Sequence, residues 1–326
     1  MKKRILSGMR PTGRLHLGHL VGALNNWVRL QDEYQCYFMV ADWHALMSEY
    51  EEPEGLAENT YELARDWVAA GLDPSRSVLF IQSHVTEHLE LAMVFSDITP
   101  LAWLERCPTY KEQLREIRGR ELATYGFLGY PVLQAADIAI YKADRVPVGV
   151  DQLPHLELTR EIVRKFKGLY NKDIFPEPEP LLTTTPKLLG LDNRKMSKSY
   201  DNCIFLSDQP ETIMKRVAGM ITDPARIRLS DKGRPDICTV FSYYSAFGTS
   251  VLKEEVRGWC VNAQKGCTEC KARLAVLLAD HLQPIRDKRK ALTTSKIREI
   301  LNEGGKKAKE AASKTMSEVK KAINLV

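Results

Sequence analysis

Short continuous apolar runs alternate with helix-like segments through the first half of the chain, and this alternation constrains the fold more than any other feature. The runs occupy residues 4–6, 36–42, 77–82 and 145–148. Uninterrupted apolar runs of this length are typical of strands that are buried on both faces. Segments with helical spacing lie between them at 18–31, 55–70 and 88–97. The pattern predicts an α/β fold with βαβ units and a doubly wound, Rossmann-like parallel sheet.

The remainder of the chain is predominantly helical in pattern. Helical spacing covers residues 102–120, 130–141 and 152–166, and almost everything beyond residue 200. The segment 176–186 is rich in proline and threonine and is interpreted as a connector or crossover. Because 326 residues suffice for about two domains, we expect a Rossmann-like domain over 1–200, with a helical insert at about 100–143, and a helical domain over 201–326.

Composition excludes several classes of protein. With 44% hydrophobic and 27% charged residues, the chain resembles an ordinary globular protein. No apolar run approaches the ~20 residues that a membrane-spanning helix needs. The basic start, Met1-Lys2-Lys3-Arg4-Ile5-Leu6, meets Ser7-Gly8 before an apolar stretch develops, so it is not a secretory signal. We therefore expect a cytoplasmic protein without a membrane partner.

The positive charge is concentrated near the carboxyl end. Between Arg286 and Lys321 there are 12 basic and 5 acidic residues, a surplus of +7 in a chain whose net charge is +5. Apolar residues such as Ile297 and Leu301 recur there at helical spacing, which predicts a basic amphipathic helix. Such a helix is either a solvated surface or a site for nucleic-acid phosphates, and charge alone does not choose between them.

The first predicted strand leads into a glycine-containing turn with two histidines. The segment reads Arg10-Pro11-Thr12-Gly13-Arg14-Leu15-His16-Leu17-Gly18-His19. A helix N-terminus at this place favours an anion, because its backbone N–H groups are unpaired and its dipole is positive there. Gly18 permits close approach of a flat base or a phosphate. Taken alone, His-x-x-His is more often a pair of ordinary surface histidines.

A second cationic motif lies far downstream, at Lys195-Met196-Ser197-Lys198-Ser199. Two lysines separated by small residues suit the negative charge that develops on a leaving polyphosphate. This motif alone is common in solvated loops. Both motifs in this order form a much more specific combination.

The pair resembles the "HIGH" and "KMSKS" signatures of class I aminoacyl-tRNA synthetases. Over essentially its whole length the chain is similar to the bacterial tryptophanyl-tRNA synthetases, and segments 40–45, 130–138 and 146–152 carry further similarity. Two departures stand out. Many members have Gln where this chain has Arg10, and the segment 192–194 is one residue short of some relatives. The effect of Arg10 on ATP or on the amino acid stays open.

The resemblance implies a reaction and a set of residues. L-tryptophan and ATP, with Mg²⁺, would form tryptophanyl-adenylate and pyrophosphate, and the tryptophanyl group would pass to tRNA(Trp) with release of AMP. The catalytic residues would be His16, His19, Lys195 and Lys198. The ATP-binding residues would be Arg10, Pro11, Thr12, Gly18, His19, Gly149, Val150, Asp151, Gln152, Leu188, Lys195, Met196, Ser197, Lys198 and Ser199. The resemblance further implies a homodimer, formed through the helical region 100–141.

Tyrosyl-tRNA synthetase is the main alternative, because it shares the fold and both signatures. An indole ring offers one N–H donor, so its site needs one acceptor in an apolar slot, and Asp137 supplies that acceptor. Archaeal-type tyrosyl enzymes have a tyrosine on the first strand where this chain has Leu6, which carries no hydroxyl. The predicted tryptophan-binding residues are Leu6, Gly8, His44, Tyr130, Gln134, Asp137, Ile138, Val146 and Val148.

Four of the seven cysteines follow a chelating pattern, Cys238-x21-Cys260-x6-Cys267-x2-Cys270. Four thiolates without histidine fit either Zn²⁺ or an iron–sulfur cluster on chemical grounds. The pattern resembles the 4Fe-4S motif of a subset of bacterial tryptophanyl-tRNA synthetases, although its first gap is one residue shorter. That resemblance implies a 4Fe-4S cluster, with Zn²⁺ as the alternative. The other three cysteines are interpreted as buried or incidental thiols.

Two further classes share part of this pattern. A nucleotidyltransferase of the same superfamily would have both signatures without needing an anticodon module, and an inactive RNA-binding paralogue would have degraded signatures. The helical domain and the basic helix argue against the first class. The presence of all four signature residues argues against the second. We therefore expect residues 1–200 to form the adenylate and residues 201–326 to recognise the anticodon.

Overall fold

The computed structural model describes residues 2–108, 110–111, 123–182 and 188–325. The chain divides into two compact units, each made of separate segments. Unit 1 comprises Met1–Gly13, Trp27–Thr183 and Thr293–Val326, and unit 2 comprises Arg14–Asn26 and Thr184–Leu292. These units are defined by packing. The predicted boundary at residue 200 divides the chain by function, and it stays a prediction.

Unit 1 contains a five-stranded parallel sheet in the order β3-β2-β1-β4-β5. Its strands are β1 (Arg4–Met9), β2 (Gln35–Val40), β3 (Ser77–Ile81), β4 (Arg145–Val148) and β5 (Glu179–Leu182). Ile5 of β1 stands beside Cys36 of β2 on one side and Arg145 of β4 on the other. The predicted doubly wound, Rossmann-like sheet is confirmed.

Strand β5 corrects the interpretation of residues 176–186 as a connector. The segment contains several prolines, a residue that is uncommon within sheets. Pro180 nevertheless pairs in register with Val146 of β4. Proline is tolerated there because β5 is an edge strand, where its missing N–H leaves no ladder bond unmade.

Helices cover both faces of the sheet, as a parallel sheet requires. In unit 1 the described helices are most of α2 (Asn25–Leu30), α3 (Asp42–Glu49), α4 (Leu56–Ala69), η2 (Gln82–His84), α5 (Glu87–Ile98), α6 (Leu101–Glu105), α8 (Tyr125–Ile140), η3 (Val150–Gln152), α9 (Leu153–Tyr170) and α14 (Thr294–Ala322). The predicted helix 102–120 lies mostly outside the described residues, and only its beginning is seen, as α6. Helix α8 begins earlier than predicted, because the Thr124 hydroxyl accepts a hydrogen bond from Phe127 N and so caps it.

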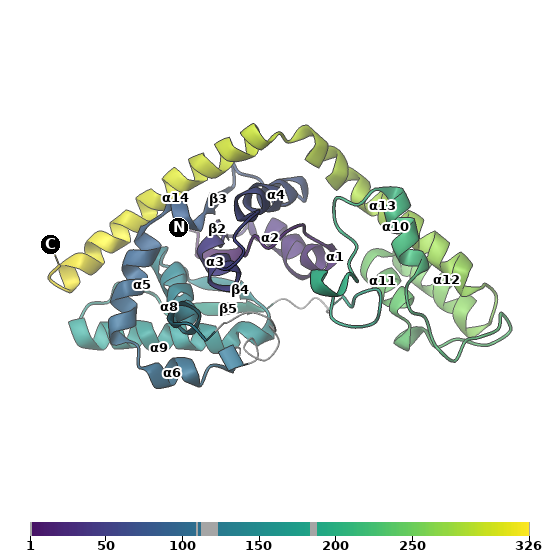
Figure 1. Ribbon diagram of the computed structural model, residues 1–326, viewed down its shortest axis with the longest axis horizontal. Coiled ribbons are helices and arrows are strands. Elements are labelled where there is room, and N and C mark those ends of the chain that lie inside the picture. The colour runs from purple at the N-terminus through teal and green to yellow at the C-terminus, as the bar shows by residue number, and fades with distance from the viewer. Residues whose placement is uncertain (1, 109, 112–122, 183–187, 326) are drawn as a thin grey trace. The chain divides into compact units, whose positions relative to one another are not determined.

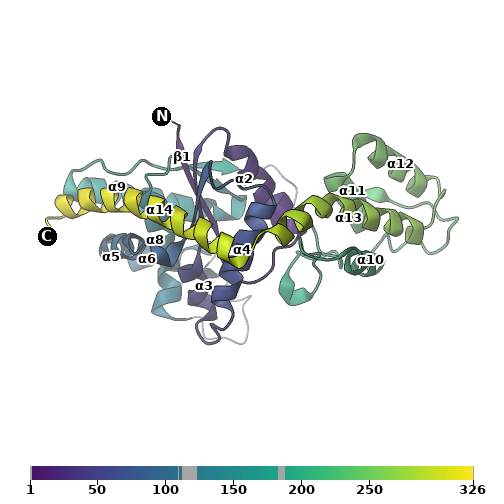
Figure 2. The same ribbon diagram turned by 90° about the horizontal axis from the view of Figure 1, so that it is seen from above.

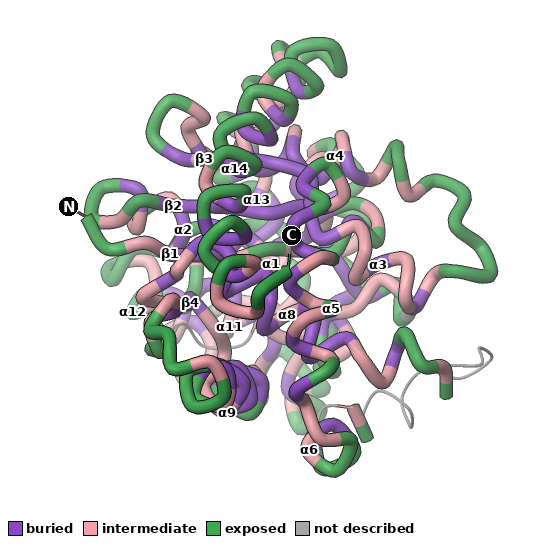
Figure 3. The backbone as a smooth tube through the Cα atoms, turned by 90° about the vertical axis from the view of Figure 1, so that its left-hand side faces the viewer, coloured by how far each residue is buried: buried purple, intermediate pink, exposed green. Residues whose placement is uncertain are grey.

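The core of unit 1 lies where α5, α8 and α9 pack together and against the sheet (Figure 3). Five of the six residues of β2 are buried. Phe95, Phe166 and Phe175 meet edge to face, with ring centroids 5.2 to 6.3 Å apart. Burial on both faces explains why these strands read as continuous apolar runs in the sequence.

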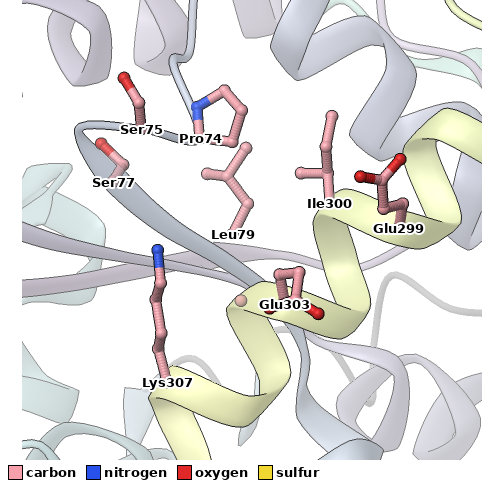
Figure 4. Close-up of a pocket in the computed structure, with 9 residues that line it drawn as sticks. Pro74, Ser75, Ser77, Leu79, Glu299, Ile300, Glu303 and Lys307 are labelled. Carbon is pink, nitrogen blue, oxygen red and sulfur yellow. The ribbon is translucent and has the colours of Figure 1, made fainter.

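Helix α14 lies along edge strand β3 and closes that side of the sheet (Figures 1 and 2). Its apolar face, which includes Ile297, Leu301 and Met316, is buried, so the predicted amphipathic pattern is confirmed. The close approach depends on Gly304. A Cβ atom at that position would lie 1.8 Å from the carbonyl oxygen of Leu79 in β3. Figure 4 shows the same contact region, with Leu79 on the strand side and Glu303 on the helix side.

The described elements of unit 2 are helices joined by long irregular segments, and the helical pattern predicted beyond residue 200 is confirmed. Its helices are α1 (Leu17–His19), η1 (Leu20–Leu24), η4 (Lys198–Tyr200), α10 (Pro210–Ala218), η5 (Pro235–Ile237), α11 (Thr239–Phe247), α12 (Ser250–Val261) and α13 (Cys267–Ala291). The predicted helix 18–31 consists of three pieces, α1, the π-helical η1 and α2 (Asn25–Leu30). No helix within the described ranges is long and apolar enough to cross a membrane.

Adjacent glycines in α14 provide a matched test of the helix–strand contact. Gly304→Ala should lower the free energy of unfolding by ~1–3 kcal/mol, because the new methyl group collides with strand backbone. Gly305→Ala should raise it by up to ~1 kcal/mol, because its Cβ would meet nothing closer than 3.8 Å and alanine favours a helix over glycine. Denaturant unfolding of both variants measures the two changes. Equal effects would contradict the assigned contact.

Candidate functional site

The first signature forms the N-terminus of a short helix in unit 2. His16 is the N-cap of α1, and its Nδ1 accepts a hydrogen bond from Gly18 N at 3.1 Å. His19 makes the reciprocal hydrogen bond of a capping box, because its Nδ1 accepts from His16 N at 3.2 Å. The two rings lie 3.8 Å apart between centroids. Both Nδ1 atoms are therefore occupied as acceptors of backbone N–H groups.

This geometry assigns the proton of each neutral ring to Nε2, where it can be donated to a ligand. Burial, followed by the positive charge of Lys198, lowers the pKa of His16 to about 4. Burial, followed by the charges of His16 and Lys198, lowers the pKa of His19 to about 3. At neutral pH both histidines are therefore uncharged hydrogen-bond donors, and the positive charge near them is that of lysine.

Gly18 is the point where the two signatures touch. Gly18 N is 3.3 Å from Met196 Sδ, and a Cβ at position 18 would crowd both that sulfur and the His16 ring. The segment that follows the second signature also pairs with the first, since Leu17 N donates to Ile204 O and Leu206 N donates to Leu15 O. The structure thus brings the two signatures together within unit 2.

Asn202 organises the loop that carries the second signature, a role that the sequence argument missed. It is buried, and its Oδ1 accepts from Ser197 N at 2.8 Å. Its Nδ2 donates to Lys195 O and to Asp192 Oδ1. A side chain on Gly190 would overlap Asn202, because a Cβ there would lie 2.2 Å from Nδ2. An asparagine three residues after the last signature residue is too common a feature to have been noticed from sequence.

The side chains of the second signature differ in exposure. Lys195 is exposed, Lys198 and Ser197 are half-buried, and Met196 is buried. Leu188, at the start of this loop, is half-buried, and Ser199 lies in η4. Lys195 is thus open to solvent, whereas Lys198 lies close enough to His16 and His19 to affect their protonation.

The predicted amino-acid site is centred on Asp137 of unit 1. This carboxylate is 2% exposed and has three hydrogen-bond donors around it. His44 Nε2 is 2.7 Å from Oδ2, and His88 Nδ1 and Gln82 Nε2 are 2.6 and 2.8 Å from Oδ1. Burial alone would raise the pKa of Asp137, but its interactions with His44 and His88 outweigh burial and lower that pKa to about 2. Asp137 is therefore a buried anion. Neither Gln82 nor His88 was identified from sequence.

The other predicted residues of this site lie on strands β1 and β4 and on helix α8. Leu6, Ile138 and Val146 are buried, whereas Val148 and Gln134 are half-buried. Gly8 lies on β1, and a Cβ there would lie 2.7 Å from the carbonyl oxygen of Met39, so only glycine fits without a shift.

Tyr130, the remaining predicted tryptophan-binding residue, is held by a buried histidine. Its hydroxyl is 2.7 Å from His155 Nε2, and burial raises the pKa of the phenol. Burial, followed by the charge of His44, lowers the pKa of His155 to about 4, so the ring is neutral. A neutral ring accepts the Tyr130 proton at Nε2, which fixes the direction of the phenol. His155 is a further residue that the sequence argument did not single out.

Turns at the carboxyl ends of β1 and β4 carry the remaining predicted residues in unit 1. After β1, Arg10 Nη1 donates to Ser48 Oγ at 3.3 Å, Pro11 is buried and Thr12 is exposed. After β4, Gln152 Nε2 donates to Asp151 Oδ2 at 3.0 Å. A Cβ on Gly149 would lie 2.6 Å from Asp151 Oδ1, and Val150 points into solvent with 69% exposure.

The four patterned cysteines line one pocket of unit 2. Cys238, Cys260, Cys267 and Cys270 share it with Arg226, Trp259 and Lys265, among others. Burial, followed by the charges of the other three thiols, raises the pKa of Cys270 to about 12, so it is protonated without a metal. In the part of the chain that the structure describes, no three Cys, His, Asp or Glu side chains stand close enough together to hold a metal ion. The donor set suits a thiolate-bound metal, but the sulfurs would have to move closer to bind one.

Comparison with known proteins gives consistent matches over nearly the whole chain. The model of the family "tRNA synthetases class I (W and Y)" matches residues 1–283. The tryptophan--tRNA ligase of Thermotoga maritima is 51% identical over 330 residues, which cover 99% of each chain. That of Aquifex aeolicus is 45% identical over 394 residues, covering 99% of this chain and all of the relative. The tryptophanyl-tRNA synthetase of Campylobacter jejuni, solved with ADP and tryptophan, is 32% identical, with a TM-score of 0.90 over 99% of this chain and 100% of the other.

Neutral signature histidines have a consequence that NMR can measure. The ring resonances of His16 and His19 should stay constant from pH 8 to pH 5 and titrate with midpoints near 4 and 3. Because the unfolded chain takes up these protons first, the free energy of unfolding should fall as the pH drops from the ordinary 6.5 towards these values. His16→Gln and His19→Gln assign the resonances. Midpoints near 6.5 would contradict the assigned protonation.

Proposed function

The chain belongs to the class I aminoacyl-tRNA synthetases for tryptophan and tyrosine, and it ligates tryptophan to tRNA with ATP. On this premise we propose which of its residues bind the substrates and which catalyse the reaction. The reaction has two steps. The tryptophan carboxylate attacks the α-phosphorus of ATP and forms the adenylate, with pyrophosphate as the leaving group. A hydroxyl of the terminal tRNA ribose then attacks the tryptophanyl carbonyl, and AMP leaves.

Asp137 is the residue that selects tryptophan, and the single observation that carries this proposal is its burial, at 2% exposure, among three hydrogen-bond donors. A carboxylate has about four lone-pair positions, and the described donors occupy three of them. One position remains for the single N–H of an indole. Leu6, Ile138 and Val146 supply apolar surface for the ring, and the half-buried His44 lies at the open side. These residues, with Gly8, Tyr130, Gln134 and Val148, form the proposed tryptophan site.

ATP is bound by the two signatures. His16 and His19 donate Nε2–H groups to phosphate oxygens, and Gly18 permits the nucleotide to approach the backbone. Neutral donors suit this role, because they orient the triphosphate without holding the product pyrophosphate too strongly. The remaining members of the proposed ATP site are Arg10, Pro11, Thr12, Gly149, Val150, Asp151, Gln152, Leu188, Met196, Ser197 and Ser199. Of these, Gly149, Asp151 and Gln152 hold the ribose and the ammonium group.

Lys195 and Lys198 stabilise the negative charge that builds up as the bond between the α- and β-phosphates breaks. Class I synthetases use Mg²⁺ with ATP, and the ion neutralises phosphate charge when it is bound. The chain's own contribution is positioning and charge. Asn202 sets the backbone of Lys195 and Ser197, so it holds both lysines in register. No side chain needs to act as a nucleophile, because both nucleophiles belong to the substrates.

Residues 1–200 are the proposed adenylate-forming domain and residues 201–326 the proposed anticodon-recognition domain. The surplus of basic residues between Arg286 and Lys321 supports contact with tRNA phosphates. A homodimer formed through the region 100–141 is the proposed assembly.

The four patterned cysteines are the proposed ligands of a 4Fe-4S cluster, with Zn²⁺ as the alternative. Convergence of Cys238, Cys260, Cys267 and Cys270 on one pocket supports a shared thiolate-bound group. When bound, the group would cross-link η5, α11, α12 and α13 and so stabilise the region that reads tRNA. Deprotonation of the thiols by the metal would reverse the raised pKa of Cys270.

Lys195→Ala tests the assignment of the signatures. ATP–pyrophosphate exchange should require tryptophan and should not proceed with tyrosine or without an amino acid. The substitution should slow this exchange by ~10²–10³, because it removes one preorganised positive charge from the transition state. Tryptophan affinity, measured by calorimetry, should change little. Lys215→Ala removes an equivalent exposed charge from α10 and should have no effect. Exchange near the wild-type rate in Lys195→Ala would contradict the role.

Metal analysis tests the cysteine proposal. Protein purified without oxygen should contain about four iron and about four sulfide per chain. Cys267→Ser should lose both, because it removes one of the four ligands. Cys203→Ser, which changes a buried thiol of the same unit outside the pocket, should retain them. Zinc without sulfide would establish the alternative.

A further inference from the structure

The two oxygens of Asp137 have different surroundings. Oδ1 receives two donors, Gln82 Nε2 at 2.8 Å and His88 Nδ1 at 2.6 Å. Oδ2 receives one donor within the described residues, His44 Nε2 at 2.7 Å. A carboxylate oxygen has two lone pairs in its plane. Oδ1 is therefore saturated, and Oδ2 has one position left.

The donors to the two oxygens also differ in how deeply they are buried. Gln82 and His88 are both 0% exposed, so the donors on Oδ1 face the interior. The His44 side chain is 13% exposed, so the donor on Oδ2 lies towards the open side of the site. The unfilled position thus belongs to the oxygen whose donor is the less buried.

Tyr141 fixes the orientation of the His88 ring. Its hydroxyl is 2.8 Å from His88 Nε2. Burial, followed by the charge of Asp137, raises the pKa of the phenol well above its usual value, so the proton stays on the oxygen and is available for donation. With Nε2 as acceptor, the ring carries a proton on Nδ1, which points to Oδ1 of Asp137.

Local structure holds this arrangement rigidly. Asp137 and Tyr141 are one turn apart, at the end of α8 and immediately after it, so a single ring can bridge them. His88 comes from α5, the helix with the most extensive packing against α8. Phe80 of β3 stacks on the His88 ring, with centroids 6.0 Å apart and planes at 26°. The ring cannot turn without losing two hydrogen bonds and this packing.

We propose that His88 is a positioning residue for indole recognition, which together with Gln82 saturates Oδ1 of Asp137 so that only Oδ2 can accept the indole N–H. The proposal rests on the proposed role of Asp137 and adds the reason why that acceptor has a defined direction. Without the His88 donor, Oδ1 has a free lone pair, and the carboxylate can turn away from the ligand. Recognition of the N–H would weaken while the apolar contacts with the ring persist.

The experiment measures the contribution of the N–H itself. ATP–pyrophosphate exchange is followed with tryptophan and with β-(3-benzothienyl)alanine, in which sulfur replaces the indole N–H. The ratio of the two kcat/KM values reports the hydrogen bond, because shape and apolar contacts are nearly the same. Wild type should prefer tryptophan by at least roughly ten-fold, as expected for a hydrogen bond to a charged acceptor. His88→Leu should bring the ratio close to one, mainly through a higher KM for tryptophan.

Two further variants separate positioning from packing. His88→Asn should retain most of the preference, because its amide can place an N–H donor where Nδ1 lies. Phe80→Leu removes packing from the ring but no hydrogen bond, so it should change both kcat/KM values by the same factor. A preference that survives in His88→Leu would overturn the proposal. If wild type itself showed no preference, the proposed role of Asp137 would fail instead.

A second measurement needs no variant and decides the matter if His88→Leu does not fold. Nitrogen-15 NMR of wild-type protein distinguishes the two tautomers of a histidine. The His88 ring should carry a proton on Nδ1, the nitrogen that faces Oδ1 of Asp137. A proton on Nε2 alone would overturn the proposal, because Nδ1 could then not donate to Asp137.

Discussion

A carboxylate in an apolar interior must be surrounded by hydrogen-bond donors or lose its charge. For Asp137, this requirement determines where several helices and turns must lie. Its donors come from α3, from η2 at the end of β3, and from α5, while Asp137 itself stands on α8. Four elements that are separate in sequence must therefore be placed to within a hydrogen-bond length. Their packing into one core provides that precision.

The parallel sheet explains why these donors meet. Strands that run in one direction end at the same edge, so the turns that follow them gather there. Gln82 follows β3, His44 lies in the helix after β2, and Gly149 follows β4. An edge strand such as β3 exposes unpaired backbone groups. Helix α14 packs against β3, and only a glycine at position 304 permits so close an approach. The fold thus stabilises the sheet at one side and leaves its carboxyl edge available for chemistry.

Residues that act through a local pattern could be predicted, and residues that act through tertiary contacts could not. The apolar runs predicted four of the five strands, because burial on both faces leaves a signal in the sequence. β5 was missed because an edge strand needs no such run. Asp137 could be predicted as a carboxylate among apolar neighbours on one helix. His88 could not be predicted, because its partner Asp137 lies 49 residues away in the sequence. Asn202 could not be predicted either, because its partners lie in a loop without regular spacing.

Charge is distributed differently over the two proposed ligand sites, and the chemistry accounts for the difference. Around Asp137 the fold keeps a negative charge where an uncharged indole must be read, so the hydrogen bond is strong and directional. At the signatures the fold does the reverse, since burial keeps His16 and His19 neutral where a highly charged triphosphate must bind. Four positive charges there would bind pyrophosphate so strongly that its release would become slow. Lysines on a loop, beside neutral histidines on a helix end, supply charge chiefly at the stage when the leaving group acquires it.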